Sequence, residues 1–307
     1  MISVLVPTRN AEPYIRSTLE SILAQNGVDL EVIVIDDGST DRSAAIARGM
    51  SDARIRIIPG PQRGISAAFN AGLAEARGEY LARCDADDLY PPDRLGWQLN
   101  FLNAHPDFGA VQGYFSTITS AAKLIADHYL NEPAGEVTDE LRRGSGRSHV
   151  CAYLYRTQIL RQIGGCREWF ITSEDRDLQY RLAEATRIWF EPRPAYLYHL
   201  HDQSITHTQK LAERAFFETC AKKFQEQRKS GAQDDLQKGT PPPIAVDGKT
   251  LAPQSAAQQI QNILLGQAWK QHAAGMKRRA IATGWRACVA RPIGFGAWKN
   301  LVALALK

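Results

Sequence analysis

Three carboxylates lie within four positions in the segment Cys84–Asp88 (Cys-Asp-Ala-Asp-Asp), directly after the apolar run 80–82. In an extended segment, residues two apart point to the same side, so Asp85 and Asp87 are expected to project together. Two neighbouring carboxylates repel each other unless a cation lies between them, and ligation by oxygen alone suits Mg²⁺ or Mn²⁺. The alternative is that Asp88 caps the following helix while the other two acids are solvated. The segment alone leaves both interpretations open.

A second acidic cluster occupies residues 173–178, with the sequence Ser-Glu-Asp-Arg-Asp-Leu. Asp175 lies three and seven residues before two leucines of the same predicted helix, so it shares their inward face. The helix dipole favours an ionised carboxylate in a first turn, which is the state that a general base needs. The alternative is an ordinary helix start that is rich in acids. Asp177 and Arg181 are four residues apart and are expected to pair on the outside of the helix.

Polar residues also follow the first two predicted strands. The first strand ends in Pro7-Thr8-Arg9-Asn10, which would frame a base or ribose, and the alternative there is an ordinary loop. The second ends in Asp36-Asp37-Gly38-Ser39, whose carboxylates can accept hydrogen bonds from a base or from ribose hydroxyls. Its alternative is a turn plus a cap. Segment 64–72 is punctuated by glycine, and its helix N-terminus could face a phosphate or its small residues could simply pack on the sheet.

Two histidines, His199 and His201, alternate in the segment 196–206 and share one face of a predicted strand. Two such histidines could be zinc ligands, but no cysteine lies nearby in the sequence. A surface strand is one interpretation. The functional alternative places His201 close to a metal or a diphosphate.

These segments need a fold that brings strand ends together, and the apolar pattern predicts one. Continuous apolar strands alternate with helices as far as residue 115, which is typical of a parallel α/β sheet covered on both faces. The strands are predicted at 2–6, 30–35, 55–58, 79–84, 108–115, 149–155, 187–191 and 195–200. The helices are predicted at 14–25, 44–46, 64–76, 94–104, 137–142, 156–163, 173–185, 207–229, 256–272, 277–290 and 297–307. Residues 230–256 have the composition of a mobile linker.

Length and composition exclude several classes of protein. With 307 residues and 44% hydrophobic residues, the chain supports one large domain and an appendage rather than a disordered protein. Its five cysteines include no CxxC pair, which argues against a disulfide framework or a zinc site and for a reducing compartment. The sequence predicts no signal peptide and no apolar run near the roughly 20 residues of a spanning helix. We therefore expect a cytoplasmic protein.

The charge is distributed unevenly along the chain. No acidic residue follows Asp247, whereas nine Lys or Arg do. Residues 1–247 therefore hold 28 basic and 33 acidic residues, a net charge of −5 within the total of +4. The basic tail predicts an anionic partner: the inner face of a membrane, a phosphate-bearing lipid or nucleic acid. Nucleic acid is a poor partner for residues 1–247, because that part of the chain is net acidic. The alternative is a helical subdomain that docks on the body.

Taken together and in order, these segments resemble glycosyltransferase family 2, whose catalytic domain has the GT-A fold. The resemblance covers residues 1–206. It implies a mostly parallel sheet flanked by helices, with a C-terminal helical extension. The chain would then consist of a catalytic domain at 1–206, a helix packing on it at 207–229, the linker at 230–256 and a basic helical region at 257–307. The matching segments are VPTRNAEPYI at 6–15, VIDDGSTD at 34–41, QRGISAAFNAGLAEARGEYLARCDADD at 62–88, PPDRL at 91–95, SEDRDLQYRLAE at 173–184 and YHLHDQSIT at 198–206.

The resemblance implies transfer of a sugar from a nucleotide-diphosphate donor, usually a UDP-sugar, with inversion, to a glycan or lipid-linked acceptor. Asp85 and Asp87 match the DXD motif that holds Mn²⁺ or Mg²⁺, and His201 matches a histidine close to the diphosphate and is counted as a third metal ligand. Asp175 matches the acid that deprotonates the acceptor, with Glu174 beside it in the catalytic pair. Positions that match the binding of the nucleotide sugar are Pro7, Thr8, Asn10, Asp36, Asp37, Arg63, Asn70, Asp85 and Ala86.

Two other functions remain compatible with parts of the sequence. A metal-dependent nucleotidyltransferase has a similar sheet, but it usually begins with a basic glycine-rich loop, which segment 7–10 is not. A sugar-nucleotide-binding protein without activity would have no need of Asp85, Asp87 and Asp175 together. A dehydrogenase is disfavoured because no GxGxxG follows the first strand.

Overall fold

The structure is a computed structural model that describes residues 1–129, 131–202, 211–244 and 255–306. Within these residues the chain divides into two compact units, and each is described by itself. The first comprises Met1–Phe115, His128–Tyr198 and Ala212–Gly248, and the second comprises Ser116–Asp127, His199–Leu211 and Lys249–Lys307. The boundaries predicted for a catalytic domain and a C-terminal region stay a prediction.

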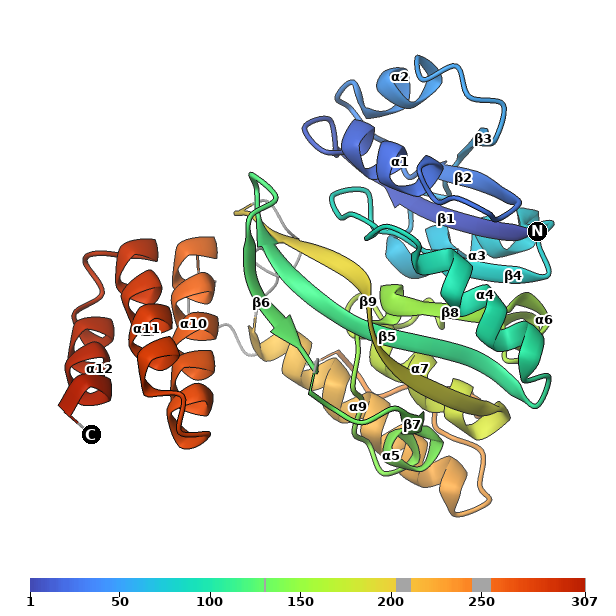
Figure 1. The fold of residues 1–307 in the computed structure, drawn as a ribbon. Coiled ribbons are helices and arrows are strands. Elements are labelled where there is room, and N and C mark those ends of the chain that lie inside the picture. Colours follow the sequence, from blue (N-terminus) through green and yellow to red (C-terminus); the bar gives the residue numbers. More distant parts are fainter. Residues whose placement is uncertain (130, 203–210, 245–254, 307) are drawn as a thin grey trace. The chain divides into compact units, whose positions relative to one another are not determined.

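Four parallel strands open the first unit, as the apolar runs predict (Figure 1). All seven residues of the first strand, Ile2–Thr8, are buried, because continuous apolar strands are covered on both faces. The strands lie in the order β3-β2-β1-β4. Their bounds are β1 Ile2–Thr8, β2 Leu30–Asp36, β3 Ile55–Pro59 and β4 Tyr80–Arg83. The helices that connect and follow them are α1 Ile15–Leu23, α2 Ser43–Arg48, α3 Ile65–Glu75 and α4 Arg94–Ala104.

The sheet continues with antiparallel strands, so the prediction of a mostly parallel sheet holds only for its first four strands. Strand β8 (Tyr153–Arg156) pairs antiparallel with β4, with Tyr80 opposite Arg156, and β5 (Phe108–Thr119) pairs antiparallel with β8. A fully buried strand has the same apolar pattern in either direction, so the sequence does not reveal this reversal. The remaining strands are β6 Leu124–His128, β7 Gly135–Glu136 and β9 Arg187–Leu200.

Three predicted strands differ from the structure. The segment 149–155 begins with a short 3₁₀ helix, η1 (Val150–Ala152), and only then becomes β8. The strands predicted at 187–191 and 195–200 are one strand, β9, of 14 residues. Its two prolines, Pro192 and Pro194, lie two residues apart, so the donors that they lack all point to one side of the strand. The hydrogen-bonded ladder on the other side is therefore not interrupted.

The helices of the first unit cover the sheet and carry much of its core. Helix α3 packs on β1 and β2, and Gly72 makes this possible, because a Cβ there would lie 2.9 Å from Ile35 and 3.0 Å from Leu5. Close packing therefore accounts for part of the glycine-punctuated segment. The later helices are α5 Thr138–Arg142, α6 Thr157–Gln162, α7 Glu174–Ala185 and α9 Leu211–Lys229. The predicted start of the last of these, at 207–210, and residues 245–254 of the predicted linker lie outside the described residues.

The second unit contains the three helices predicted beyond the linker (Figure 1, orange and red). Their bounds are α10 Ala256–Ala273, α11 Lys277–Ala290 and α12 Phe295–Leu306. Ala268, Ala280 and Leu304, one from each helix, are fully buried and form a small core of their own. No described helix is both long enough and apolar enough to cross a membrane.

Candidate active site

The predicted polar strand ends meet at one edge of the parallel strands. Thr8, the last residue of β1, pairs in register with Asp36, the last residue of β2. The backbone N–H of Asp37 donates to the carbonyl of Thr8 at 2.9 Å, and that of Cys84 donates to the carbonyl of Leu5 at 2.9 Å. Pro7 and Thr8 are buried in β1. The edge therefore brings the first, second and fourth strand ends together, where open α/β sheets bind ligands.

The carboxylates of Asp36 and Asp37 both accept hydrogen bonds from nearby backbone amides. Asp36 Oδ1 accepts from the N–H of Ser39 at 3.0 Å, which closes a turn. Asp37 accepts from the N–H of Gln62 at 2.6 Å and from that of Gly64 at 3.3 Å. The turn-and-cap alternative thus describes part of what these residues do. Their contact with a nucleoside stays a prediction.

Asn10, Arg63 and Asn70 each have a partner in the protein. Asn10 adopts a left-handed backbone (φ 52°), and its Oδ1 accepts from the N–H of Thr40 at 2.8 Å. Arg63 pairs with Glu168 at 3.0 Å and remains largely exposed. The amide of Asn70 donates to the carbonyl of Cys166 at 2.8 Å and accepts from its N–H at 2.9 Å. Of the three, Arg63 is the side chain most available to a ligand.

The acidic segment 85–88 is a turn and not a continuation of the strand. Strand β4 ends at Arg83, and the N–H of Asp88 donates to the carbonyl of Asp85 at 3.1 Å. Asp85 and Asp87 therefore do not follow one another in an extended strand, and the predicted extended segment is wrong. Asp87 is half-buried. Burial of Tyr14 raises the pKa of that residue, and the negative charge of Asp87 raises it further. Asp87 thus lies near the start of α1.

Asp88 is fully buried and does not cap a helix. The hydroxyl of Tyr196 donates to Asp88 Oδ2 at 2.6 Å and accepts from the N–H of Asp85 at 3.0 Å. Helix α4 begins later, at Arg94, with Asp93 before it, so the helix-cap alternative for Asp88 is wrong. Tyr196 instead holds both ends of the acidic turn. In its middle, the carbonyl of buried Ala86 accepts from Thr18 Oγ1 at 2.9 Å.

Arg83 joins the two acidic clusters. Its Nε donates to Asp85 Oδ1 at 2.7 Å and its Nη1 donates to Glu174 Oε1 at 3.3 Å. The arginine is only 5% exposed. Burial raises the pKa of Asp85, but the charges of Arg83 and His149 and the hydrogen bond from Arg83 act against burial, and the net pKa is lowered. Burial also raises the pKa of Glu174, and there the charge of Arg83 offsets it only in part.

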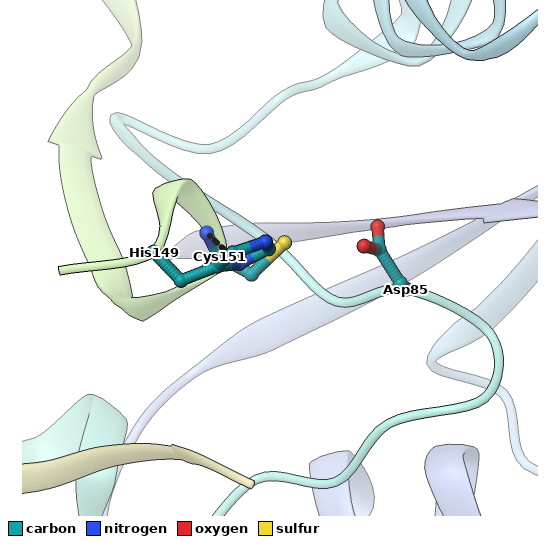
Figure 2. A group of neighbouring side chains, drawn as sticks. All are labelled: Asp85, His149 and Cys151. Atoms are coloured by element: carbon teal, nitrogen blue, oxygen red, sulfur yellow. Dashed lines mark hydrogen bonds between the residues drawn. The ribbon is translucent and has the colours of Figure 1, made fainter. Parts of the chain in front are cut away.

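His149 and Cys151 lie beside Asp85, on the short helix η1 and the residue before it (Figure 2). One ligand atom from each of the three lies within 4.8 Å of the others. The N–H of Cys151 donates to His149 Nδ1 at 3.3 Å. Burial raises the pKa of the Cys151 thiol well above its usual range, so the thiolate that a metal ligand requires is disfavoured. Carboxylate oxygens suit Mn²⁺ or Mg²⁺ better than this mixed group does, and metal ligation by Asp85 and Asp87 stays a prediction.

Asp175 is half-buried in the first turn of α7. Burial lowers the pKa of His149, and the charges of Asp85 and Asp175, in that order, partly offset this. The imidazole of His149 therefore lies within electrostatic range of both acidic clusters. Ser173, the residue before the helix, adopts a left-handed backbone (φ 58°) and makes no capping hydrogen bond with its side chain.

Asp177 and Arg181 form the predicted pair, but the pair is buried and does not lie on the outside of the helix. Asp177 is fully buried and accepts from Arg181 Nε at 2.8 Å and from Arg167 Nε at 2.9 Å. Arg167 also donates to Asp234 at 2.7 Å. Helix α7 is buried along one continuous stretch, so spacing alone could not assign its faces. Two arginines compensate the buried carboxylate, as a buried charge requires.

His199 and His201 are buried in the second unit. His201 as a metal ligand or as a contact to the diphosphate therefore stays a prediction. Gln203–Thr206, the rest of its motif, lie outside the described residues.

The prediction from sequence missed Arg83, Tyr196, His149 and Cys151. Arg83 does carry a signal, because it ends a strand in which every residue is buried, and a buried arginine needs a partner. His149 and Cys151 carry no local signal. They reach Asp85 because β8, which follows η1, pairs with β4.

A family model described as "Glycosyl transferase family 2" matches residues 3–164 of the chain. EpsH of Bacillus subtilis (strain 168), which is named as a glycosyltransferase, is 31% identical over 242 residues, which are 74% of this chain and 70% of EpsH.

Two solved structures have a similar fold. One is S. aureus TarS in complex with UDP-GlcNAc, with a TM-score of 0.61, 22% identity, and coverage of 71% of this chain and 64% of that one. The other is the mannosyltransferase PcManGT from Pyrobaculum calidifontis in complex with GDP-Man and Mn²⁺, with a TM-score of 0.56, 20% identity, and coverage of 100% and 86%. At these identities the likeness bears on the fold alone.

Proposed function

This chain belongs to glycosyltransferase family 2 and has the GT-A fold, and from this premise we propose that it transfers a sugar from a nucleotide-diphosphate donor to a hydroxyl group with inversion. One observation carries the proposal. Arg83, which is only 5% exposed, donates hydrogen bonds both to Asp85 in the acidic turn and to Glu174 in the first turn of α7. One cluster suits a metal and a diphosphate, and the other suits an acceptor proton. Their proximity supports a single site that serves both the donor and the acceptor of a transfer reaction.

The donor is proposed to lie along the ends of β1 and β2. The structural neighbours TarS and PcManGT hold UDP-GlcNAc and GDP-Man, which share a nucleoside diphosphate and differ in base and sugar. We assign the nucleoside to Pro7, Thr8, Asn10, Asp36 and Asp37, with Arg63 and Asn70 nearby. Since Asn70 and Asp37 already hold backbone groups, they would shape the pocket, while Arg63 would contact the donor. A UDP-sugar is the proposed donor.

Asp87 and Asp85 would hold the divalent cation, Mn²⁺ or Mg²⁺. A cation held there supplies positive charge that stabilises the nucleoside diphosphate as it leaves. Asp85 also accepts from Arg83, which leaves Asp87 as the stronger candidate for a direct ligand and Asp85 for ribose or metal. Tyr196 would position the acidic turn, because its hydroxyl binds the N–H of Asp85 and the carboxylate of Asp88.

Asp175 is proposed as the general base. Its place in the first turn of α7 favours the ionised form, and it is half-buried rather than enclosed, so that an acceptor hydroxyl can reach it. The hydroxyl would lose its proton to Asp175 as its oxygen attacks the anomeric carbon, and the bond from that carbon to the diphosphate would break. Glu174, which pairs with Arg83, would position this turn.

The proposal is tested with Asp87→Asn and Asp175→Asn, and with Asp139→Asn as a control whose side chain is 73% exposed in a surface ion pair. Both site variants should lose transfer by at least about a hundredfold, while the thermal melting temperature without ligand stays close to that of the wild type. Asp87→Asn should also lose the stabilisation by UDP that depends on Mn²⁺, whereas Asp175→Asn should keep it. Near-normal turnover in either variant would refute the role assigned to it.

Incubation of the wild type with a panel of sugar nucleotides separates an enzyme from a binder without activity. A glycosyltransferase consumes or slowly hydrolyses one sugar nucleotide from a panel, and a binder is only stabilised by it. The acceptor is proposed to be a hydroxyl of a glycan or of a lipid-linked sugar. A lipid-linked acceptor would favour a peripheral position on the inner face of the membrane.

A further inference from the structure

The helices α11 and α12 and the segment 291–294 between them expose a set of large apolar side chains within the second unit. Ile293 is 84% exposed, Phe295 71% and Leu306 81%, although each is of a type that is usually buried. Of the described residues with exposed large apolar side chains, more than half lie between 285 and 306. The set consists of Trp285, Val289, Ile293, Phe295, Trp298, Val302 and Leu306.

These side chains form one continuous face. On α12, residues 295, 298, 302 and 306 follow one another at intervals of three and four, which places them on one side of the helix. Trp285 and Val289 have the same spacing on α11. The rings of Trp285 and Trp298 meet edge to face, with centroids 5.7 Å apart, and so join the stripes of the two helices.

The exposed face is not needed to hold the helices together. Their opposite sides already bury Ala280 and Leu304 against Ala268 of α10. Trp269 adds a hydrogen bond to Asn300 Oδ1 at 2.7 Å. The face is therefore an addition to a small core that is already complete, and contiguous exposed apolar surface of this kind marks an interaction site.

The charges around the face have a single sign. The first turn of α11 exposes Lys277, Arg278 and Arg279. Lys299 lies on α12 with its Nζ 5.1 Å from the centre of the Phe295 ring. No acidic residue occurs anywhere in 248–307. The partner must therefore combine negative charge with an apolar interior.

We propose that this face, made of α11 and α12, lies on an anionic phospholipid membrane. Trp and Phe side chains favour the boundary between headgroups and acyl chains, and lysine and arginine bind the anionic headgroups. The helices lie on the surface and do not enter deeply, because none of those described can cross a bilayer. The proposal extends the proposed function by giving the enzyme a fixed place near lipid-linked sugars, but it does not depend on catalysis.

The test is flotation of the full chain with vesicles of phosphatidylcholine alone and with vesicles in which part of it is replaced by phosphatidylglycerol. The wild type should float with the anionic vesicles and not with the neutral ones. Val302→Glu places a charge in the face and should weaken binding by at least about tenfold. Replacing Lys277, Arg278 and Arg279 with Gln should weaken it by roughly a hundredfold. Ile244→Glu, at a residue 47% exposed in the other unit, should leave it unchanged.

Three outcomes would overturn the proposal. The first is that the wild type does not float with anionic vesicles, and the second is that Val302→Glu floats as well as the wild type. The third is that light scattering shows a dimer, which Val302→Glu dissociates, while the protein binds no vesicle. The last would mean that a second copy of the chain covers the face. None of these readouts uses activity, so a failed transferase assay and a failed membrane assay stay distinguishable. Circular dichroism of each variant checks that the helices remain folded.

Discussion

The edge of the sheet around Arg83 and the outer face of α11 and α12 depart in opposite ways from the usual pattern, in which charged side chains are exposed and large apolar ones are buried. The first buries charge: Arg83, Asp88 and Glu174 are each less than 10% exposed. The second exposes apolar surface, as Ile293 and Leu306 show. In the first region every buried charge named here has a protein partner at hydrogen-bond distance, so the site is organised before a ligand arrives. In the second region the large side chains are available to something outside the unit.

This difference predicts how each region responds to substitution. Removing one partner from a buried network leaves the others desolvated and unpaired, which is costly. Removing an exposed apolar side chain takes away surface that the folded unit never buried. Substitutions in the first region should therefore lower the free energy of unfolding. Substitutions on the exposed face of the second region should weaken only the binding of a partner.

The largest effect is expected for Arg83→Met. It leaves Asp85 and Glu174 without their buried cation, and breaking a buried ion pair costs about 3–5 kcal/mol. Urea denaturation measures the loss. Transfer should fall further than the loss of folded protein explains, because both acidic clusters lose the residue that positions them.

The matched control for this variant is Arg42→Met. Arg42 pairs with Glu12 at 2.6 Å, but its side chain is 80% exposed, and pairs of that kind contribute about 0–1 kcal/mol. If the two variants destabilised the protein equally, burial would not be what sets the two ion pairs apart. Adding Glu174→Gln to Arg83→Met should recover part of the stability and none of the activity.

A smaller effect is expected for Tyr196→Phe. The hydroxyl that it removes donates to buried Asp88 and accepts from the N–H of Asp85, and a hydrogen bond to a charged group contributes about 1.5–3 kcal/mol. The turn should loosen, so the stabilisation by UDP that depends on Mn²⁺ should weaken together with the melting temperature. Tyr198→Phe, two residues along the same strand, is the control. An unchanged response to UDP and Mn²⁺ would mean that the turn does not need Tyr196.

The two regions also differ in how far the sequence predicts them. The ends of β1, β2 and β4, at Thr8, Asp36 and Arg83, were predictable to within two residues, because an apolar run followed by polar residues marks a strand and its edge. The helices of the tail were predictable to within a few residues, because their apolar residues recur at helical spacing. What the sequence could not supply was the direction of β8. That direction decides that His149 and Cys151 lie beside Asp85, 64 and 66 positions earlier in the chain.

The assignment of faces failed where a helix is buried on more than one side. Asp177 and Arg181 have the spacing of an ordinary surface pair, and nothing in that spacing shows that Arg167 approaches from outside the helix. Arg83 is the opposite case, because its place at the end of a buried strand indicated a buried partner. Its partners, however, were fixed only by the fold, since Glu174 is 91 positions away.

The smallest effect on stability is expected for Val302→Gln, on the exposed face of α12. Val302 is 56% exposed, so little apolar burial is lost, and Gln has a higher helix propensity than Val by a few tenths of a kcal/mol. The free energy of unfolding should therefore stay within about 0.5 kcal/mol of the wild type. Leu304→Gln, two residues later and fully buried, should instead cost at least about 2 kcal/mol, because it places a polar amide in the small core. Urea denaturation followed by the circular dichroism of the helices compares the two. A large loss from Val302→Gln would mean that the face is part of the folded core and is not free to bind a membrane.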